Sequence, residues 1–259
     1  MKQQTLRRVV VTRPVERAEG LCALLQQAGY EPFRFPALAL RACPADTAVT
    51  EIIGRLDTFD MAFFVSPSAV TFGLDLVRSQ RVWPLSLSVG AVGAGTVRAL
   101  NAQGFSHVVA PADGNDSEAV LALESFAEKA VKNRKIALFC ATETRPLLTE
   151  TLNQRGAQVV HVVCYQRCCP PLDPSELLAC HASGQLAALT FASAETVRNF
   201  LRLVGEQGVG ALRTLPVFVT HPKIAPAVRE AGFTQIGIAE NTGDSALLAC
   251  LRRFFQGQG

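Results

Sequence analysis

The sequence repeats itself once, at a spacing of about half its length. The segment LLQQAGYEPFRFPAL resembles TLNQRGAQVVHVVCY and aligns Gly29 with Gly156, an offset of 127 residues (156 − 29 = 127). Three more pairs follow in the same order at offsets of 127 or 128: FFVSPSAV with LTFASAETV, VRALNAQGF with APAVREAGF, and NDSEAVLAL with TGDSALLACL. Solenoid repeats are only ~20–50 residues long. The offset therefore predicts duplication of a domain-sized unit, and its alternative is the general self-similarity of parallel α/β chains.

Short apolar runs rich in β-branched residues alternate with amphipathic stretches of helical period along the whole chain. This alternation is typical of βα units in a parallel sheet. A length of 259 residues fits one large domain or two small ones, and the repeat favours two similar α/β domains of flavodoxin or Rossmann type. The expected strands are Arg8–Thr12, Glu31–Leu40, Met61–Val65, Ser88–Val92, Val108–Ala110, Ile136–Cys140, Val159–Tyr165, Ala188–Phe191, Val217–Thr220 and Gln235–Ala239.

Charge and hydropathy exclude several classes of partner. The formal net charge is +3 and no five like charges follow one another, which argues against a nucleic-acid partner. The longest uncharged stretch, 177–194, carries His181 and Gln185, which are costly in hydrocarbon, so no membrane span is expected. The N-terminus lacks the apolar region of a secretory signal. We therefore expect a cytoplasmic location.

The same location predicts that the eight cysteines are free thiols. No CxxC pair occurs, and the four histidines lie far apart without the spacing of metal ligands. No metal site is expected.

Polar residues follow most of the predicted strands, where open parallel sheets bind their ligands. Ser and Thr at these places are good helix N-caps, and capping alone is the alternative interpretation of any one of them. As a set, helix N-termini with hydroxyls and three cations, Arg13, Arg145 and Lys223, predict a site for a ligand with many carboxylates. The segments are Thr12-Arg13-Pro14, Ser66-Pro67-Ser68, Gly93-Ala94-Gly95-Thr96, 141–145, 192–196 and His221-Pro222-Lys223.

The sequence signatures of several common enzyme classes are missing. The glycines of VGAGTVRAL do not make GxGxxG, because Arg98 stands where the third glycine is needed. A GxxxxGK[ST] phosphate loop and a GxSxG elbow are also absent, and no histidine is spaced for a hydrolase triad. Dinucleotide binding and triad hydrolysis are therefore not expected.

Two positions differ in character between the copies. Tyr165 stands where the first copy has Leu38, and Thr96 stands where the second copy has Ile224. An apolar residue would serve a scaffold at both places, so the polar residues are functional candidates. The alternative for Tyr165 is a strand tyrosine with its hydroxyl at the surface.

Seven motifs together resemble one family. In chain order they are VVVTRP, FVSPSAV, VGAGTVRAL, GNDSEAV, TRPLLTETLNQRGAQVVHVVCYQR, THPKIAPAVREAGF and NTGDSALLACL. Over essentially its whole length the chain resembles the uroporphyrinogen-III synthases. The resemblance implies two α/β domains, residues 1–38 with 170–259 and residues 39–169, joined by linker strands near 38–41 and 165–169, with the active site in a cleft between the domains.

The resemblance also implies an activity. The substrate would be hydroxymethylbilane, a linear tetrapyrrole with eight carboxylates, cyclised to uroporphyrinogen III with loss of water and inversion of the last ring. It implies no cofactor and a monomer, and we expect a transient contact with hydroxymethylbilane synthase. Tyr165 matches the family's linker tyrosine, which assists departure of the hydroxyl group. The carboxylates would be bound by Arg13, Ser66, Ser68, Thr96, Arg145, Ser193 and Lys223.

One segment departs from the family pattern. His221-Pro222-Lys223-Ile224 replaces a Gly-Pro-Thr-Thr-like turn, so a hydroxyl is lost at Ile224 and Lys223 would supply a cation instead. Two rival functions stay open at this point. One is a hinged two-domain binding or sensor protein without catalysis, and the other is a cofactor-using transferase.

Overall fold

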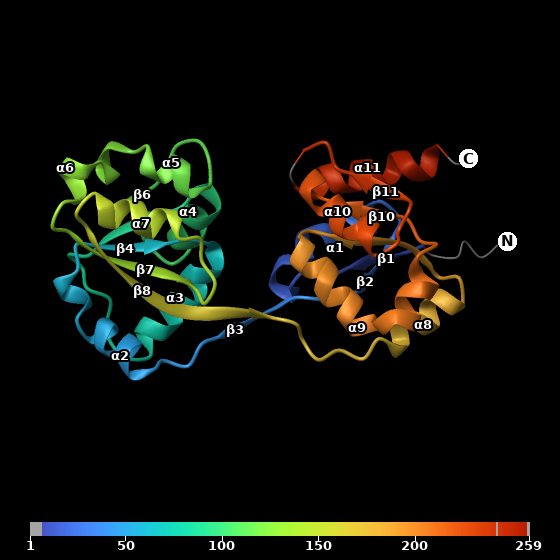
Figure 1. Ribbon diagram of the computed structural model, residues 1–259, viewed down its shortest axis with the longest axis horizontal. Helices are drawn as coiled ribbons and strands as arrows, with labels where there is room; N and C mark the ends of the chain where they lie inside the picture. The colour runs from blue at the N-terminus through green and yellow to red at the C-terminus, as the bar shows by residue number, and fades with distance from the viewer. Residues whose placement is uncertain (1–6, 242, 258–259) are drawn as a thin grey trace. The chain divides into compact units, whose positions relative to one another are not determined.

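A computed structural model describes residues 7–241 and 243–257 of the chain (Figure 1). The chain divides into two compact units, Met1–Ala39 with Cys168–Gly259, here unit 1, and Leu40–Arg167, here unit 2. Both points where the chain passes from one unit to the other fall at strands, β3 (Ala39–Ala42) and β8 (Gln158–Cys168). Each unit has a mainly parallel sheet covered by helices, which confirms the predicted α/β class.

Unit 1 contains a five-stranded sheet in the order β11-β10-β9-β1-β2, and every neighbouring pair is parallel. Alternate residues of β1 pack on opposite faces, because side chains alternate along a strand. Val10 joins the core under α8, α9 and α10, and Val9 and Val11 join the core under α1 and α11. The strands are β1 (Arg8–Val11), β2 (Glu31–Arg34), β9 (Leu186–Phe191), β10 (Val217–Val219) and β11 (Ile236–Ile238); the helices are η1 (Val15–Arg17), α1 (Glu19–Gln27), α8 (Ser175–Ala182), α9 (Ala194–Leu212), η4 (Pro222–Ile224), α10 (Ala225–Glu230) and α11 (Asp244–Gln256).

Unit 2 contains a six-stranded sheet in the order β3-β8-β7-β4-β5-β6. Phe64 faces the core formed with α2, α3 and α4, and its neighbour Phe63 faces the core formed with α5 and α7. The further strands are β4 (Met61–Phe64), β5 (Ser88–Ala91), β6 (Val108–Val109) and β7 (Lys135–Ala141); the helices are α2 (Thr47–Gly54), η2 (Leu56–Thr58), α3 (Pro67–Arg78), α4 (Ala94–Asn101), α5 (Ser117–Leu121), η3 (Glu124–Phe126), α6 (Glu128–Val131) and α7 (Leu147–Gln154).

The sequence repeat has a counterpart in the backbone. Gly29 and Gly156 follow α1 and α7 with φ of 82° and 83°, a left-handed conformation that glycine adopts without steric cost. The offset matches β1, β2, β4, β5 and β6 with β7, β8, β9, β10 and β11. Both sheets therefore have the same order of equivalent strands, and each takes its first two from one copy and its last three from the other.

The prediction of a single strand over Glu31–Leu40 is wrong. β2 ends at Arg34 and pairs with β1, whereas β3 begins at Ala39 and lies beside β8 in the other sheet. Pro36 lies in the gap and has no N–H to continue a ladder. In the second copy the equivalent residue is Val163, and β8 runs unbroken through it. The other predicted strands are confirmed, with shifted ends.

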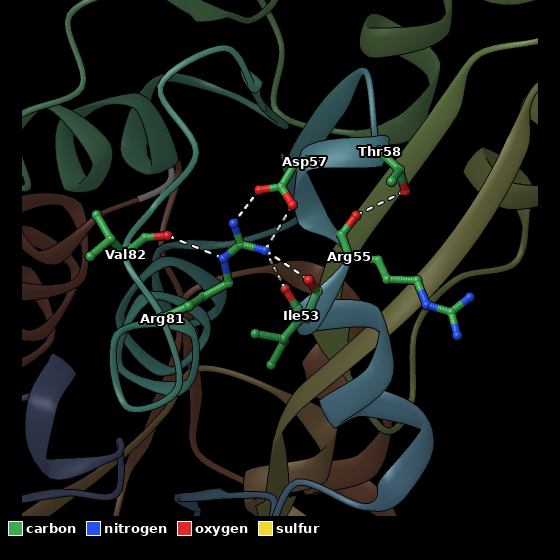
Figure 2. A network of polar contacts seen from close by, with 7 residues as sticks. Ile53, Arg55, Asp57, Thr58, Arg81 and Val82 are labelled. Atoms are coloured by element: carbon green, nitrogen blue, oxygen red, sulfur yellow. Dashed lines mark hydrogen bonds and ion pairs between the residues drawn. The ribbon is translucent and has the colours of Figure 1, made fainter.

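Arg81 links the C-terminal ends of two helices of unit 2, α2 and α3 (Figure 2). Arg81, just after α3, donates to the carbonyls of Ile53 at 3.2 Å and Gly54 at 2.9 Å at the end of α2, and it pairs with Asp57. Its Nε also donates to the carbonyl of Val82 at 3.2 Å. These bonds hold the C-terminal end of α3, the helix whose N-terminal end carries Ser66.

Candidate functional site

Leaving aside the edge strand β3, each sheet has one place from which the chain order of the strands runs outward in both directions. Ligands of open α/β sheets bind beyond the carboxyl ends of the strands at such a place. In unit 2 this place lies between β7 and β4, and in unit 1 it lies between β1 and β9. Four of the predicted residues follow the strands beside these places. Ser66 and Arg145 follow β4 and β7, and Arg13 and Ser193 follow β1 and β9.

The structure brings Ser66 and Tyr165 together across 99 residues of sequence. The Ser66 Oγ lies 3.0 Å from the Tyr165 Oη, and either hydroxyl can be the donor. Ser66 is also the N-cap of α3, because its Oγ accepts the N–H of Ala69 at 3.0 Å. Capping is thus one role of Ser66, and contact with Tyr165 is a second.

Tyr165 is held firmly in its place on β8. Its side chain is 2% exposed, and its ring stacks on Phe72 with centroids 5.4 Å apart and planes inclined by 16°. The register of β7 and β8 shifts between Cys140 and Ala141, beside Tyr165. A surface position for this tyrosine, the alternative at the sequence level, does not occur. Tyr165 is thus buried, whereas its partner Ser66 is half-buried and the next residue, Pro67, is exposed.

The other candidates of unit 2 lie in the first turns of helices or just before them. Ser68 is in the first turn of α3 and is buried. Thr96 is in the first turn of α4 and 1% exposed, and among the described residues its hydroxyl has no hydrogen-bond partner. Gly93 begins this helix, and a side chain there would meet Cα of Asn115 at 2.9 Å, so the glycine is required by close packing. Arg145 is exposed and forms no ion pair within the described part of the chain.

In unit 1 the predicted arginine, Arg13, already has an ion-pair partner. Arg13 forms an ion pair with Asp244, the first residue of α11, and the two side chains are 15% and 25% exposed. Asp244 was not a candidate at the sequence level. The available signal is the repeat, which matches it with Asp116 (244 − 116 = 128). Asp116 caps α5 by accepting the Ala119 N–H at 2.9 Å. The aspartate thus forms an ion pair in one copy and caps a helix in the other.

Ser193 and Lys223 complete the predicted set. The Ser193 Oγ accepts the Thr196 N–H at 3.1 Å and lies 2.7 Å from the Thr196 Oγ1. Lys223 is exposed, and its backbone N–H donates to Nδ1 of His221 at 3.1 Å. Ile224 is 5% exposed and belongs to the core of unit 1. At this position, where the chain departs from the family turn, the side chain therefore contributes to packing.

The thiols near Tyr165 are not ionised at neutral pH. Burial raises the pKa of Cys140 and of Cys164 to about 12, and burial also raises the pKa of Cys43. No disulfide links any of the eight cysteines. In the described ranges no three His, Cys, Asp or Glu side chains are grouped so as to hold a metal ion. No helix formed by the described residues is long and apolar enough to cross a membrane.

Comparisons with a family model and with known protein sequences point to the same family. A family model described as Uroporphyrinogen-III synthase HemD matches residues 19–249. The uroporphyrinogen-III synthase of Salmonella typhimurium is 28% identical over 247 residues, covering 94% of this chain and 99% of that protein. The Escherichia coli protein of the same name is 26% identical over 246 residues, with the same coverage. The Proteus mirabilis protein is 31% identical over 160 residues, or 61% of this chain and 79% of that protein.

Solved structures share the fold. Uroporphyrinogen-III synthetase from Helicobacter pylori superposes with a TM-score of 0.63 at 16% identity and covers 96% of this chain and 99% of that one. A mutant uroporphyrinogen III synthase from Thermus thermophilus superposes with a TM-score of 0.57 at 22% identity, covering 97% and 99%. At these identities the likeness concerns the fold alone.

Proposed function

The chain belongs to the uroporphyrinogen-III synthase family, and we propose on that basis that it closes hydroxymethylbilane to uroporphyrinogen III with loss of water and inversion of the last pyrrole ring. The observation that carries the assignment of chemistry to residues is the hydrogen bond between Ser66 and Tyr165. It holds a phenol at the carboxyl end of the sheet, next to the N-terminus of α3.

Tyr165 assists departure of the hydroxyl group. The pyrrole nitrogen pushes electrons toward the hydroxymethyl carbon, the C–O bond breaks, and its electron pair leaves with the oxygen. A phenol has an O–H group that can hydrogen-bond to this oxygen or protonate it to water. The ring carbon that closes the macrocycle later releases a proton, which restores the phenol. The balance is one water lost and no net change in the enzyme.

The larger task is steering, because an unguided bilane closes without inverting the last ring. Holding the reacting rings in one geometry is positional catalysis. In unit 2 we assign carboxylate binding to Ser68, Thr96 and Arg145, because helix N-termini and guanidinium groups favour anions. Ser66, a candidate for the same role from the sequence, is left out because its hydroxyl is engaged by Tyr165 and the Ala69 N–H. In unit 1 we assign carboxylate binding to Arg13, Ser193 and Lys223. Arg13 must give up part of its pairing with Asp244 in this role.

The test is incubation with freshly generated hydroxymethylbilane, followed by separation of the uroporphyrin isomers after oxidation. We expect isomer III, and isomer I alone would contradict the synthase assignment. Tight binding of the bilane without turnover would instead support the non-catalytic binding protein.

A variant of Tyr165 tests the role of this residue in the reaction. We expect Tyr165→Phe to lower kcat by roughly ten- to a hundredfold without abolishing it, because the phenol only assists a departure that the pyrrole drives. Tyr30→Phe is the matched control, since Tyr30 is the other of the two tyrosines and packs against Phe255 in unit 1. Unchanged turnover of Tyr165→Phe would remove Tyr165 from the mechanism.

A further inference from the structure

We propose that Ser66 is a positioning residue that acts through Tyr165. In this arrangement the Ser66 hydroxyl donates to the Tyr165 Oη, so the phenol keeps its own proton for the substrate, and the lack of a hydroxyl at position 69 keeps Ser66 turned this way. The inference rests on the proposed function and assigns the orientation of its reactive proton.

The hydrogen bonds of the Ser66 hydroxyl are compatible with this orientation. A serine hydroxyl has one proton to donate and two lone pairs to accept with. The Ala69 N–H occupies one lone pair of the Ser66 Oγ at 3.0 Å, and the Tyr165 Oη lies 3.0 Å away. If Ser66 donates its proton, the Tyr165 oxygen is the acceptor and the phenol O–H points elsewhere.

The other copy of the repeat provides an internal comparison for Ser66. Ser193 caps α9 as Ser66 caps α3, with φ and ψ of −158° and 157° against −168° and 162°. The Ser193 hydroxyl, however, is paired with the Thr196 Oγ1 at 2.7 Å. Position 196 matches Ala69 in the first copy (196 − 69 = 127). Each cap serine therefore has one hydroxyl partner, but on a different element.

The two copies differ at two matching positions, and both differences change which hydroxyl the cap serine can pair with. In unit 2 the strand supplies Tyr165 and the helix has Ala69, whereas unit 1 has Leu38 and Thr196 at the matching positions. Ala69 is fully buried and offers Ser66 no competing side-chain partner. The pairing of Ser66 with Tyr165 thus depends on both residues.

The proposal is tested by kinetics of single and double variants on isomer III formation. We expect Ser66→Ala to lower kcat about tenfold, the factor that one hydrogen bond of ordinary strength contributes, with KM little changed. Ser66→Thr keeps a capping hydroxyl and should retain most of the kcat. Asp46→Ala removes the N-cap of α2, where Asp46 accepts the Val49 N–H at 2.8 Å, and controls for the loss of a cap away from the site.

The decisive measurement is the double variant Ser66→Ala/Tyr165→Phe. If Ser66 acts through Tyr165, the double variant has the kcat of Tyr165→Phe alone. A further tenfold loss would overturn the proposal, because Ser66 would then act on the substrate independently. Ala69→Ser gives Ser66 the kind of partner that Ser193 has, and we expect kcat to fall severalfold; a wild-type kcat would overturn the role of position 69. Failure of the proposed function is distinct from both, since the unmodified protein would then form no isomer III.

Discussion

The Arg13–Asp244 ion pair predicts that one aspartate carries stability in unit 1 that its repeat equivalent does not carry in unit 2. The perturbation is Asp244→Asn, which keeps shape and removes charge. The matched control is Asp116→Asn at the equivalent position. Asparagine caps helices about as well as aspartate, so Asp116 loses little when it is replaced.

The magnitude follows from the exposure of the pair. Two unit charges ~4 Å apart attract by about 4 kcal/mol at an effective dielectric constant of ~20, and desolvation cancels part of this. Exposed pairs contribute ~0.2–1 kcal/mol, whereas removing one partner of a fully buried pair costs ~3–5 kcal/mol. With side chains 15% and 25% exposed, the pair lies between these limits. We expect Asp244→Asn to lower the free energy of unfolding by about 2 kcal/mol and Asp116→Asn to lower it by about 0.5 kcal/mol.

Urea unfolding measures the difference. At a slope of ~2 kcal/mol per M, a loss of 2 kcal/mol moves the midpoint by about 1 M. Far-UV circular dichroism reports on helices of both units, whereas the single tryptophan, Trp83, belongs to unit 2. We expect the shift for Asp244→Asn to be larger by circular dichroism than by fluorescence. An Arg13→Met/Asp244→Asn double-mutant cycle should give a coupling of about 2 kcal/mol. Equal midpoints for the two aspartate variants would refute the reasoning.

Two further predictions concern titratable groups. Cys140 and Cys164, with pKa values raised to about 12 by burial, should resist iodoacetamide at pH 8 in the native protein and react in urea, as mass spectrometry of peptides would show; rapid native labelling would contradict their burial. The Lys135 N–H, and next the Arg134 guanidinium, lower the pKa of Asp60 from 3.8, so its stabilisation is present at neutral pH and lost as pH falls below about 4. The free energies of unfolding of Asp60→Asn and the unmodified protein should differ by about 1 kcal/mol at pH 7, and this difference should shrink as the pH falls below about 4; a difference that grows in acid would contradict the prediction.

Much of the fold follows from local sequence, because strand residues and helix caps leave local signals. Ser66 and Ser193 precede apolar helical stretches and do cap them. The single strand predicted over Glu31–Leu40 failed for a non-local reason. The chain changes sheets there, and only Pro36, set against Val163 in the other copy, marks the break.

The site is harder to predict, since its contacts join distant residues. The Ser66–Tyr165 bond spans 99 residues and the Arg13–Asp244 pair spans 231. No periodicity encodes such contacts. The residue types at the strand ends indicate an anion site, but only the packed structure distinguishes the paired Arg13 from the exposed Arg145.

The mixed origin of the two sheets has a consequence for symmetry. One copy of the repeat supplies two strands to one sheet and three to the other, so it completes neither alone. Two separate copies would complete each other and form a dimer with identical halves, by the exchange of elements known from domain swapping. In such a dimer positions 38 and 165 would be the same residue, as would 69 and 196. Joining the copies in one chain frees each position from its twin, and a single tyrosine facing a single cap serine is an asymmetry that only the fused chain can encode.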